Sequence, residues 1–234
     1  MTIDVLEDAD AVAKRAAAWI AAEAGAAVAA RGRFAIAVSG GRTPWLMLRA
    51  LAREDVPWAA VHLLQVDERA TSAGDADRNL THIQDTLLAH VPIPPEQVHA
   101  MPVELPDLDA AARHYSDTMR LVAGDPPVLD AVHLGLGPDG HTASLVPGDA
   151  VLDVHDRDVA ATGVYQGRRR LTLTYPALNR ARRILWLVTG PDKVDALARL
   201  RRGDRSIPAG RIDQARATAI VDRAALGEPA GSLG

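Results

Sequence analysis

The chain contains no cysteine among its 234 residues. Disulfides and thiolate chemistry are therefore excluded, and any metal would have to bind to histidine, aspartate or glutamate. The eight histidines are scattered without the spacing of a metal site, so we expect no dedicated metal centre. Neither sign of charge is in large excess, because 26 basic and 30 acidic residues give a formal net charge of only −4. This balance gives no reason to expect a nucleic acid or an anionic membrane as a partner.

Long hydrophobic runs are also missing. The first ten residues have neither the basic nor the apolar region of a signal peptide. The alanine-rich segment 16–30 contains Glu23 and is too short and too weakly apolar to span a bilayer. We therefore expect a cytoplasmic protein in which residues 1–234 form a single domain, present as a monomer or a weak homo-oligomer.

Several catalytic motifs are absent as well. There is no Gly-x-Ser-x-Gly elbow and no His-Glu-x-x-His pair, which disfavours a Ser-His-Asp hydrolase and a zinc protease. No Gly-Lys-Ser/Thr ends a glycine loop, which disfavours binding of a nucleoside triphosphate. Gly135, Gly137 and Gly140 match the dinucleotide spacing, but no acidic residue stands clearly at the end of a following strand.

Apolar runs and helical patterns alternate along the whole chain. Helices are predicted over 8–30, from Thr43-Pro44 onward, over 79–91, over 107–123, briefly after Pro176, and over 192–201. Strands are predicted over 34–39, 61–66, 97–102, 129–137, 158–165, 169–178, 182–190 and 216–222. This alternation predicts an α/β fold, a Rossmann-like, mostly parallel sheet with helices on both faces. Ligands bind at the carboxyl ends of the strands in such sheets.

The segment "SGGRTP" joins a strand to a helix at residues 39–44. Gly40 and Gly41 let the backbone approach a ligand closely, and the helix start supplies free N–H groups that suit a phosphate. The hydroxyls of Ser39 and Thr43 add possible donors. The alternative is a tight structural turn in which Thr43 is the N-cap and Pro44 the first helical residue.

The segment "LGLGPDGHTAS" (134–144) follows another strand and carries His141 at the strand exit. A histidine with a pKa near ~6.5 can take and return a proton at neutral pH, and Asp139 is placed to orient it. Thr142 and Ser144 are predicted to cap a following helix. The alternative is a structural turn with an exposed histidine.

Three further segments carry charge near strand ends. "DER" places Asp67, Glu68 and Arg69 together, and a guanidinium can hold a phosphate or carboxylate through two contacts. Arg168–Arg170 precede a strand and are either an anion site or a solvated edge. Lys193 lies in the first turn of a predicted helix, where the helix dipole disfavours a positive charge. An anionic ligand bound at this place would explain why a lysine stands there.

Taken in order, these segments resemble the 6-phosphogluconolactonase family, within a broader group that includes glucosamine-6-phosphate isomerases and deaminases. The resemblance covers nearly the whole chain and is carried by "VSGGRTP", "VDER", "RNL", "LGLGPDGHTASLVPG", "RRLTLTYPALNRAR", "LVTGPDK" and "IPAGRI". It implies a glucosamine-6-phosphate isomerase-like fold, a phosphorylated sugar lactone as substrate, and no cofactor.

The resemblance also implies roles for individual residues. His141, with Asp139 beside it, matches the proton-transfer residue, and Arg69 matches an arginine that contacts substrate. Further residues match positions that bind substrate or phosphate: Ser39, Gly40, Gly41, Thr43, Asp67, Asn79, Gly140, Arg170 and Lys193. The sequence departs from the family at Ala70-Thr71, where Val-Pro is common, and at Arg78, where serine is common.

Two other functions are weighed against the lactonase. Aminosugar-phosphate deaminases usually follow the Asp-Gly-His turn with Asn-Glu-Pro, whereas this chain has Leu145-Val146-Pro147. Non-catalytic sugar-phosphate sensors of similar fold usually carry a DNA-binding domain, and no helix-turn-helix segment is evident here. Both Asp139 and His141 are also retained, which favours an enzyme.

Overall fold

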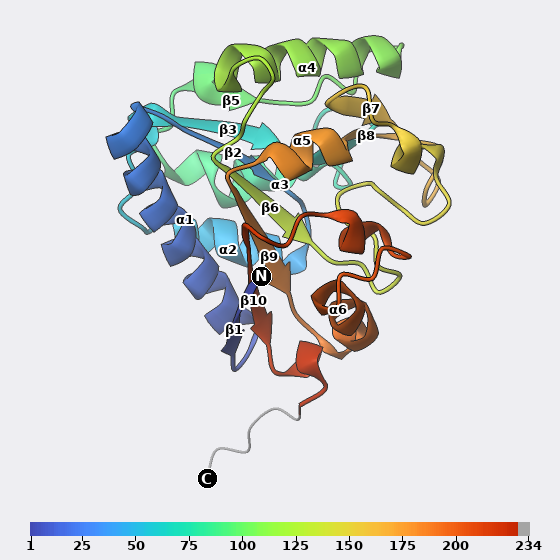
Figure 1. Cartoon of the computed structure of the whole chain (residues 1–234). Coiled ribbons are helices and arrows are strands. Elements are labelled where there is room, and N and C mark those ends of the chain that lie inside the picture. The colour runs from blue at the N-terminus through green and yellow to red at the C-terminus, as the bar shows by residue number, and fades with distance from the viewer. Residues whose placement is uncertain (229–234) are drawn as a thin grey trace.

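The computed structural model describes residues 1–228; residues 229–234, which the single-domain prediction included, lie outside the described part (Figure 1). Its centre is a seven-stranded sheet in the order β1-β10-β9-β6-β2-β3-β5. Every neighbouring pair in this sheet is parallel, which confirms the predicted mostly parallel α/β fold. The strands are β1 (Thr2–Leu6), β2 (Phe34–Val38), β3 (Val61–Gln65), β5 (Val98–His99), β6 (Ala131–Gly135), β9 (Arg183–Val188) and β10 (Ala217–Asp222).

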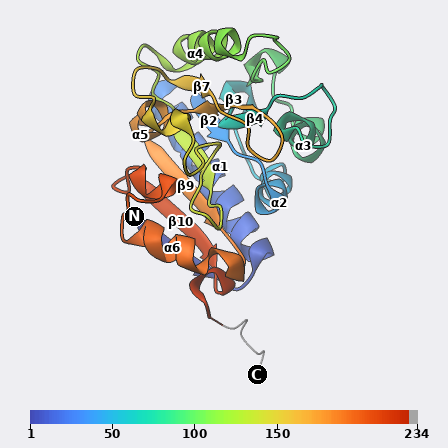
Figure 2. The same ribbon diagram turned by 90° about the vertical axis from the view of Figure 1, so that its right-hand side faces the viewer.

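Helices cover both faces of the sheet (Figures 1 and 2). One face packs against α1 (Ala9–Arg31), α2 (Arg42–Leu51) and α3 (Asn79–Thr86), and the other packs beneath α4 (Leu108–Ala123), α5 (Tyr175–Arg180) and α6 (Val194–Arg201). Strand β2 illustrates why both faces of the sheet are covered, because its side chains are apolar on both faces. Successive side chains point to opposite faces, so Phe34, Ile36 and Val38 enter the first core, while Ala35 and Ala37 enter the second.

A second, three-stranded antiparallel sheet lies beside the main one, in the order β4 (Asp67–Arg69), β8 (Arg170–Leu173) and β7 (Val159–Ala161). The predictions of strands over 158–165 and 169–178 are wrong in extent, because β7 ends at Ala161 and α5 begins at Tyr175. These strands also do not join the parallel sheet. The short strand β4 and the N-terminal strand β1 were not predicted; β1 pairs with the edge of β10.

Several predicted boundaries shift. The helix predicted over 79–91 ends at Thr86, the strand predicted over 97–102 is only two residues long, and α6 begins at Val194 after a short turn. Thr43 is not the N-cap of α2; Gly41 occupies that position. Short 3-10 turns lie at Trp58–Ala60, Leu88–His90, Pro95–Gln97, Ala150–Asp153, Pro191–Lys193, Pro208–Arg211 and Ala224–Leu226. None of the helices within residues 1–228 is long and apolar enough to cross a membrane.

Parallel pairing fixes where the polar segments meet. Strands β2, β3, β6 and β9 all run in the same direction, so their carboxyl ends lie at one edge of the sheet. The segments that follow them begin at Ser39, Val66, Leu136 and Thr189, and these are the four segments that the sequence marks as candidate ligand sites.

Candidate active site

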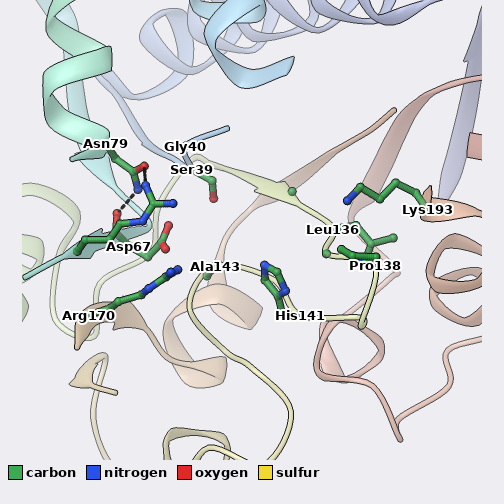
Figure 3. A pocket seen from close by; sticks show the side chains of 13 residues that line it. Ser39, Gly40, Asp67, Asn79, Leu136, Pro138, His141, Ala143, Arg170 and Lys193 are labelled. Carbon is green, nitrogen blue, oxygen red and sulfur yellow. Dashed lines mark hydrogen bonds between the residues drawn. The ribbon is translucent and has the colours of Figure 1, made fainter. Parts of the chain in front are cut away.

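A cavity of about 190 Å³ lies at this edge, and residues from all four strand exits line it (Figure 3). They are Ser39, Gly40, Asp67, Arg69, Asn79, Gly135, Leu136, Gly137, Pro138, His141, Ala143, Arg170 and Lys193. A second hollow adjoins it and is lined by the start of α2 and by the loop after β9, including Gly41, Thr43, Thr189, Gly190 and Asp192. Gly40, Gly135, Leu136 and Lys193 line both, so the cavity and the hollow share a wall.

His141 and Asp139 form a hydrogen-bonded pair at the cavity wall. Nδ1 of His141 lies 2.6 Å from Oδ1 of Asp139, and the same oxygen accepts the backbone N–H of His141 at 3.1 Å. A carboxylate only accepts, so in the neutral imidazole Nδ1 carries the proton and Nε2 keeps its lone pair. Burial acts to raise the pKa of Asp139, but the hydrogen bonds from His141 outweigh it and hold that pKa below its usual value. Asp139 is therefore ionised at neutral pH. Figure 3 shows the imidazole pointing into the cavity between Arg170 and Lys193.

The segment after β6 is a tight turn and not the start of a helix. The N–H of Gly137 donates to the carbonyl of His141 at 2.8 Å, and Gly140 takes a φ of 82° to close the turn. The prediction that Thr142 and Ser144 cap a helix is therefore wrong. Thr142 is buried, and the hydroxyl of Ser144 donates instead to Asp67, which lines the cavity.

Asp67, Ser144 and Arg170 form a buried chain on one side of the cavity. Ser144 Oγ donates to Oδ2 of Asp67 at 2.6 Å, and Nη1 of Arg170 lies 3.4 Å from the same hydroxyl. Burial lowers the pKa of Arg170, although the nearby Asp67 carboxylate opposes this shift. Arg170 therefore presents a poorly hydrated cation to the cavity, a state that favours an anionic ligand.

Arg168, Arg169 and Arg170 separate in the structure. Only Arg170 lines the cavity. Arg168 pairs with Asp77 at 3.0 Å and with Asp75 at 3.4 Å, and Nε of Arg169 donates to the carbonyl of Thr162.

The opposite end of this wall is built around Glu68. Its buried carboxylate accepts the N–H groups of Asn79 and Leu80, both at 2.8 Å, and so caps the start of α3. Asn79 in turn accepts from Nη1 of Arg69 at 2.5 Å and donates to the carbonyl of Asp67 at 2.8 Å. Glu68 and Asn79 thus hold Arg69 at the cavity.

Arg78 and Ala70-Thr71, the two departures from the family pattern, are accommodated beside this network. Arg78 is buried and forms ion pairs with Glu68, at 3.6 Å, and with Glu104. The Ala70 N–H donates to the carbonyl of Arg169, and the Thr71 hydroxyl donates to Asp75 at 2.5 Å. Thr71 thus makes a contact within the loop that leads to Asn79, whereas Ala70 and the ion pairs of Arg78 join this loop to its surroundings.

The glycine loop after β2 is packed closely from behind. A methyl group on Gly40 would lie 1.9 Å from Oδ1 of Asn79 and 2.8 Å from Trp45, so only glycine fits. Ser39 donates its hydroxyl to the carbonyl of His133 at 3.0 Å and its N–H to Nδ1 of His133 at 3.3 Å. Ser39 lines the cavity, but both of its donors are engaged in holding the loop.

The adjoining hollow carries the other expected phosphate contacts. Gly41 and Thr43 lie there at the start of α2, and the Thr43 hydroxyl is 2.6 Å from that of Thr189. Lys193 reaches both spaces and pairs with Asp192 at 2.8 Å. Helix starts and a lysine together favour an anion at this point.

The structure thus brings most of the predicted residues to the cavity or to the adjoining hollow. Asp139 stands behind His141, while Gly140 is turned away and packs against Ile207. The contacts of Ser144 with Asp67 were missed because a helix was expected there. The loop-supporting role of His133 was also missed, although a histidine inside an apolar strand was a signal for it.

The fold and the cavity define an α/β protein whose candidate ligand site lies at the carboxyl edge of a parallel sheet. The family model described as glucosamine-6-phosphate isomerases/6-phosphogluconolactonase matches residues 7–221. The chain therefore belongs to this family.

Individual relatives narrow the match. The 6-phosphogluconolactonase of Synechocystis sp. is 38% identical over 202 residues, covering 85% of this chain and 84% of the relative. That of Mycobacterium tuberculosis is 37% identical over 236 residues, covering 95% and 96%. The crystal structure of the Thermotoga maritima 6-phosphogluconolactonase superposes with a TM-score of 0.84 at 27% identity, covering 94% of this chain and 98% of that one. These similarities confirm the enzyme class expected from the sequence.

Proposed function

We propose that this chain hydrolyses 6-phospho-D-glucono-1,5-lactone to 6-phospho-D-gluconate, the second step of the oxidative pentose phosphate pathway. The observation that carries the proposal is the position of His141. Its Nε2 accepts no hydrogen bond from residues 1–228 and faces a cavity that has arginines on one side and a glycine loop with a lysine on the other. The names of the relatives point to the same reaction.

In this proposal the phosphate binds in the adjoining hollow, and the lactone ring binds in the cavity. The first turn of α2, Thr43 and Lys193 offer N–H, hydroxyl and ammonium donors to the phosphate. Arg170 stands across the cavity from Lys193 in Figure 3, so it faces the ring and not the phosphate. This modifies the expectation that Arg170 and Lys193 bind the phosphate together. A ligand that is anchored at one end is held with its carbonyl near His141.

A lactone is an activated ester, so no covalent nucleophile is needed. Nε2 of His141 accepts a proton from a water molecule as that water attacks the C1 carbonyl carbon. The resulting imidazolium is stabilised by Asp139, which already accepts the Nδ1 proton at 2.6 Å. When the tetrahedral intermediate collapses, the C1–O bond to the ring breaks, and the ring oxygen takes the proton from Nε2.

The negative charge that develops on the carbonyl oxygen needs donors on the same side of the cavity. Arg69 is held there by Asn79, and its Nη1 is engaged, while the rest of the guanidinium remains for the ligand. Arg170 adds a second cation a short distance away. Fixed cations that are already in place stabilise an oxyanion without reorganisation.

The decisive experiment measures acid release from freshly generated lactone, with the spontaneous rate subtracted because this lactone also opens unaided. The wild-type protein is expected to accelerate hydrolysis, and His141→Ala is expected to lower kcat by roughly 10²- to 10⁴-fold. Binding of 6-phosphogluconate, measured by calorimetry, is expected to survive in the variant. The matched control is His114→Ala, because His114 is exposed on α4.

Near wild-type turnover in His141→Ala would contradict the proposed mechanism. Absence of lactone turnover by the wild-type protein, together with tight binding of 6-phosphogluconate, would favour a sensor. Release of ammonia from glucosamine 6-phosphate would favour a deaminase.

A further inference from the structure

A two-residue turn places the side chain of Tyr165 against His141 and Arg170. The turn (the hairpin turn, Tyr165–Arg168) is closed by reciprocal hydrogen bonds between Tyr165 and Arg168, at 2.9 and 3.3 Å. Its central residues, Gln166 and Gly167, have φ values of 52° and 77°. Positive φ at both positions is the geometry whose twist matches a β-hairpin. The turn therefore fixes the backbone of Tyr165 shortly before β8.

Gln166 is an unfavourable residue for this turn, because a left-handed φ crowds its side chain against the backbone. Its amide oxygen accepts a hydrogen bond from Nη2 of Arg170 at 3.1 Å. The residue that strains the turn thus also binds the arginine that lines the cavity. The turn and Arg170 are parts of one arrangement.

The ring of Tyr165 contacts two residues of the proposed site at once. Its centroid lies 5.8 Å from that of the His141 imidazole, at an interplanar angle of 63°, which is an edge-to-face contact. The guanidinium carbon of Arg170 lies 5.0 Å from the same centroid, which is a cation–π contact. Tyr165 is not among the residues that line the cavity. It therefore reaches the ligand only through His141 and Arg170.

An aromatic ring suits this place for a chemical reason. Arg170 is buried, and its Nε has no hydrogen-bond partner in the described part of the chain. A carboxylate in the place of the ring would neutralise the guanidinium and compete with an anionic ligand. The π face attracts the cation without a formal charge, so the charge of Arg170 remains available to the cavity.

The hairpin turn is also hydrogen-bonded to the segment that supports Arg69. Arg168 donates from Nε and Nη2 to Oδ2 of Asp77, at 3.1 and 3.0 Å. The carbonyl of Asp77 in turn accepts from Nη1 of Arg69 at 3.1 Å. These two hydrogen bonds from Arg168 to Asp77 (the clasp) link the segment that supports Arg69 to the turn that carries Tyr165.

We propose that Tyr165 is a positioning residue for the reaction, which fixes the imidazole of His141 and the guanidinium of Arg170 relative to each other. The proposal rests on the proposed lactonase function. Tyr165 acts through these two side chains, and the clasp holds the turn in place.

The test compares Tyr165→Leu, Tyr165→Phe and Val164→Ala for kcat, KM and melting temperature. Tyr165→Leu is expected to lower kcat by about 3- to 30-fold, because the cation–π and edge-to-face contacts are lost, and to leave KM within about threefold. Tyr165→Phe keeps the ring and is expected to restore kcat to within about twofold of wild type. Val164 is 72% exposed in the same loop, so Val164→Ala controls for changes in that loop and should have no effect.

A kcat for Tyr165→Leu within twofold of wild type would overturn the proposal, as would an equal loss in Val164→Ala. If Tyr165→Leu does not fold, Arg168→Gln releases the clasp while keeping the ring, and a lowered kcat is expected; unchanged kinetics would count against the role. A second readout does not depend on turnover. The proton resonances of the His141 imidazole should shift in Tyr165→Leu but not in Val164→Ala, because the ring current of Tyr165 is removed. If the wild-type protein fails to hydrolyse the lactone, the proposed function falls, and these resonances still decide whether the ring of Tyr165 lies against His141.

Discussion

A methyl group on the α carbon of Gly137 would lie 2.1 Å from Nδ1 of His141 and 2.6 Å from Oδ1 of Asp139. The hydrogen-bonded pair of imidazole and carboxylate therefore occupies the space that a side chain at residue 137 would fill. The glycine in this turn is required by the close approach of the pair.

Gly137→Ala is therefore expected to displace His141 and lower kcat by about 10²-fold, since a shift of about 1 Å in a reacting group has this effect. The matched control is Gly25→Ala in α1, where a methyl group meets nothing within 4 Å. Alanine should raise the unfolding free energy there by roughly 0.5–1 kcal/mol and leave kcat unchanged. Steady-state kinetics and denaturant unfolding of both variants check this. Unchanged turnover in Gly137→Ala would show that the pair is not in its working geometry here.

Asp139→Asn tests the charge of the pair separately from its geometry. The amide oxygen still accepts the Nδ1 proton of His141, but the negative charge that stabilises the imidazolium is gone. We expect kcat to fall by roughly 10²- to 10⁴-fold, with affinity for 6-phosphogluconate little changed. Comparison of kcat and product binding in the two proteins is the measurement. Full activity in Asp139→Asn would mean that Asp139 only shapes the turn.

Lys193→Met tests the place of the phosphate. Loss of a charge-assisted hydrogen bond is expected to raise KM by roughly 10- to 100-fold with a smaller change in kcat. Asp192→Asn is the informative partner, because Asp192 holds the ammonium group at 2.8 Å and competes with the phosphate for it. This variant should lower KM. A lowered kcat with unchanged KM in Lys193→Met would place the phosphate elsewhere.

Acid should destabilise the protein through His133. Burial lowers the pKa of this histidine from 6.5 to about 3, so the unfolded chain binds a proton that the folded chain does not. Stability contributed by neutral His133 is complete above pH 6.5 and is lost as the pH falls from 6.5 toward 3, at about 1.4 kcal/mol for each pH unit.

The measurement is the unfolding free energy in denaturant between pH 7 and pH 4. His133→Asn removes the titrating group and should flatten the pH dependence, whereas His114→Asn, at an exposed histidine on α4, should not. Equal slopes in wild type and His133→Asn would contradict the prediction.

The sequence alone was sufficient to predict the α/β class and the edge of the sheet where the candidate site lies. Strands such as 34–38 are short and wholly apolar, which is typical of a strand buried on both faces, and parallel strands place their exits at one edge. The polar segments that begin at Ser39, Asp67 and Gly135 were therefore expected to meet. Local chemistry was sufficient for these predictions, because each depends on a few neighbouring residues.

The partners of the individual side chains depend on long-range packing, which the sequence does not reveal. Ser39 resembles a phosphate donor in the sequence, yet it gives both its donors to His133, which lies 94 residues away in the chain. Ser144 was predicted to cap a helix, yet it bonds to Asp67, which lies 77 residues away in the chain. Nothing in the sequence distinguishes Tyr165 from any other loop residue. These assignments depend on which partners lie within hydrogen-bond reach, and that is set by the packing of β4, β7 and β8 beside the main sheet.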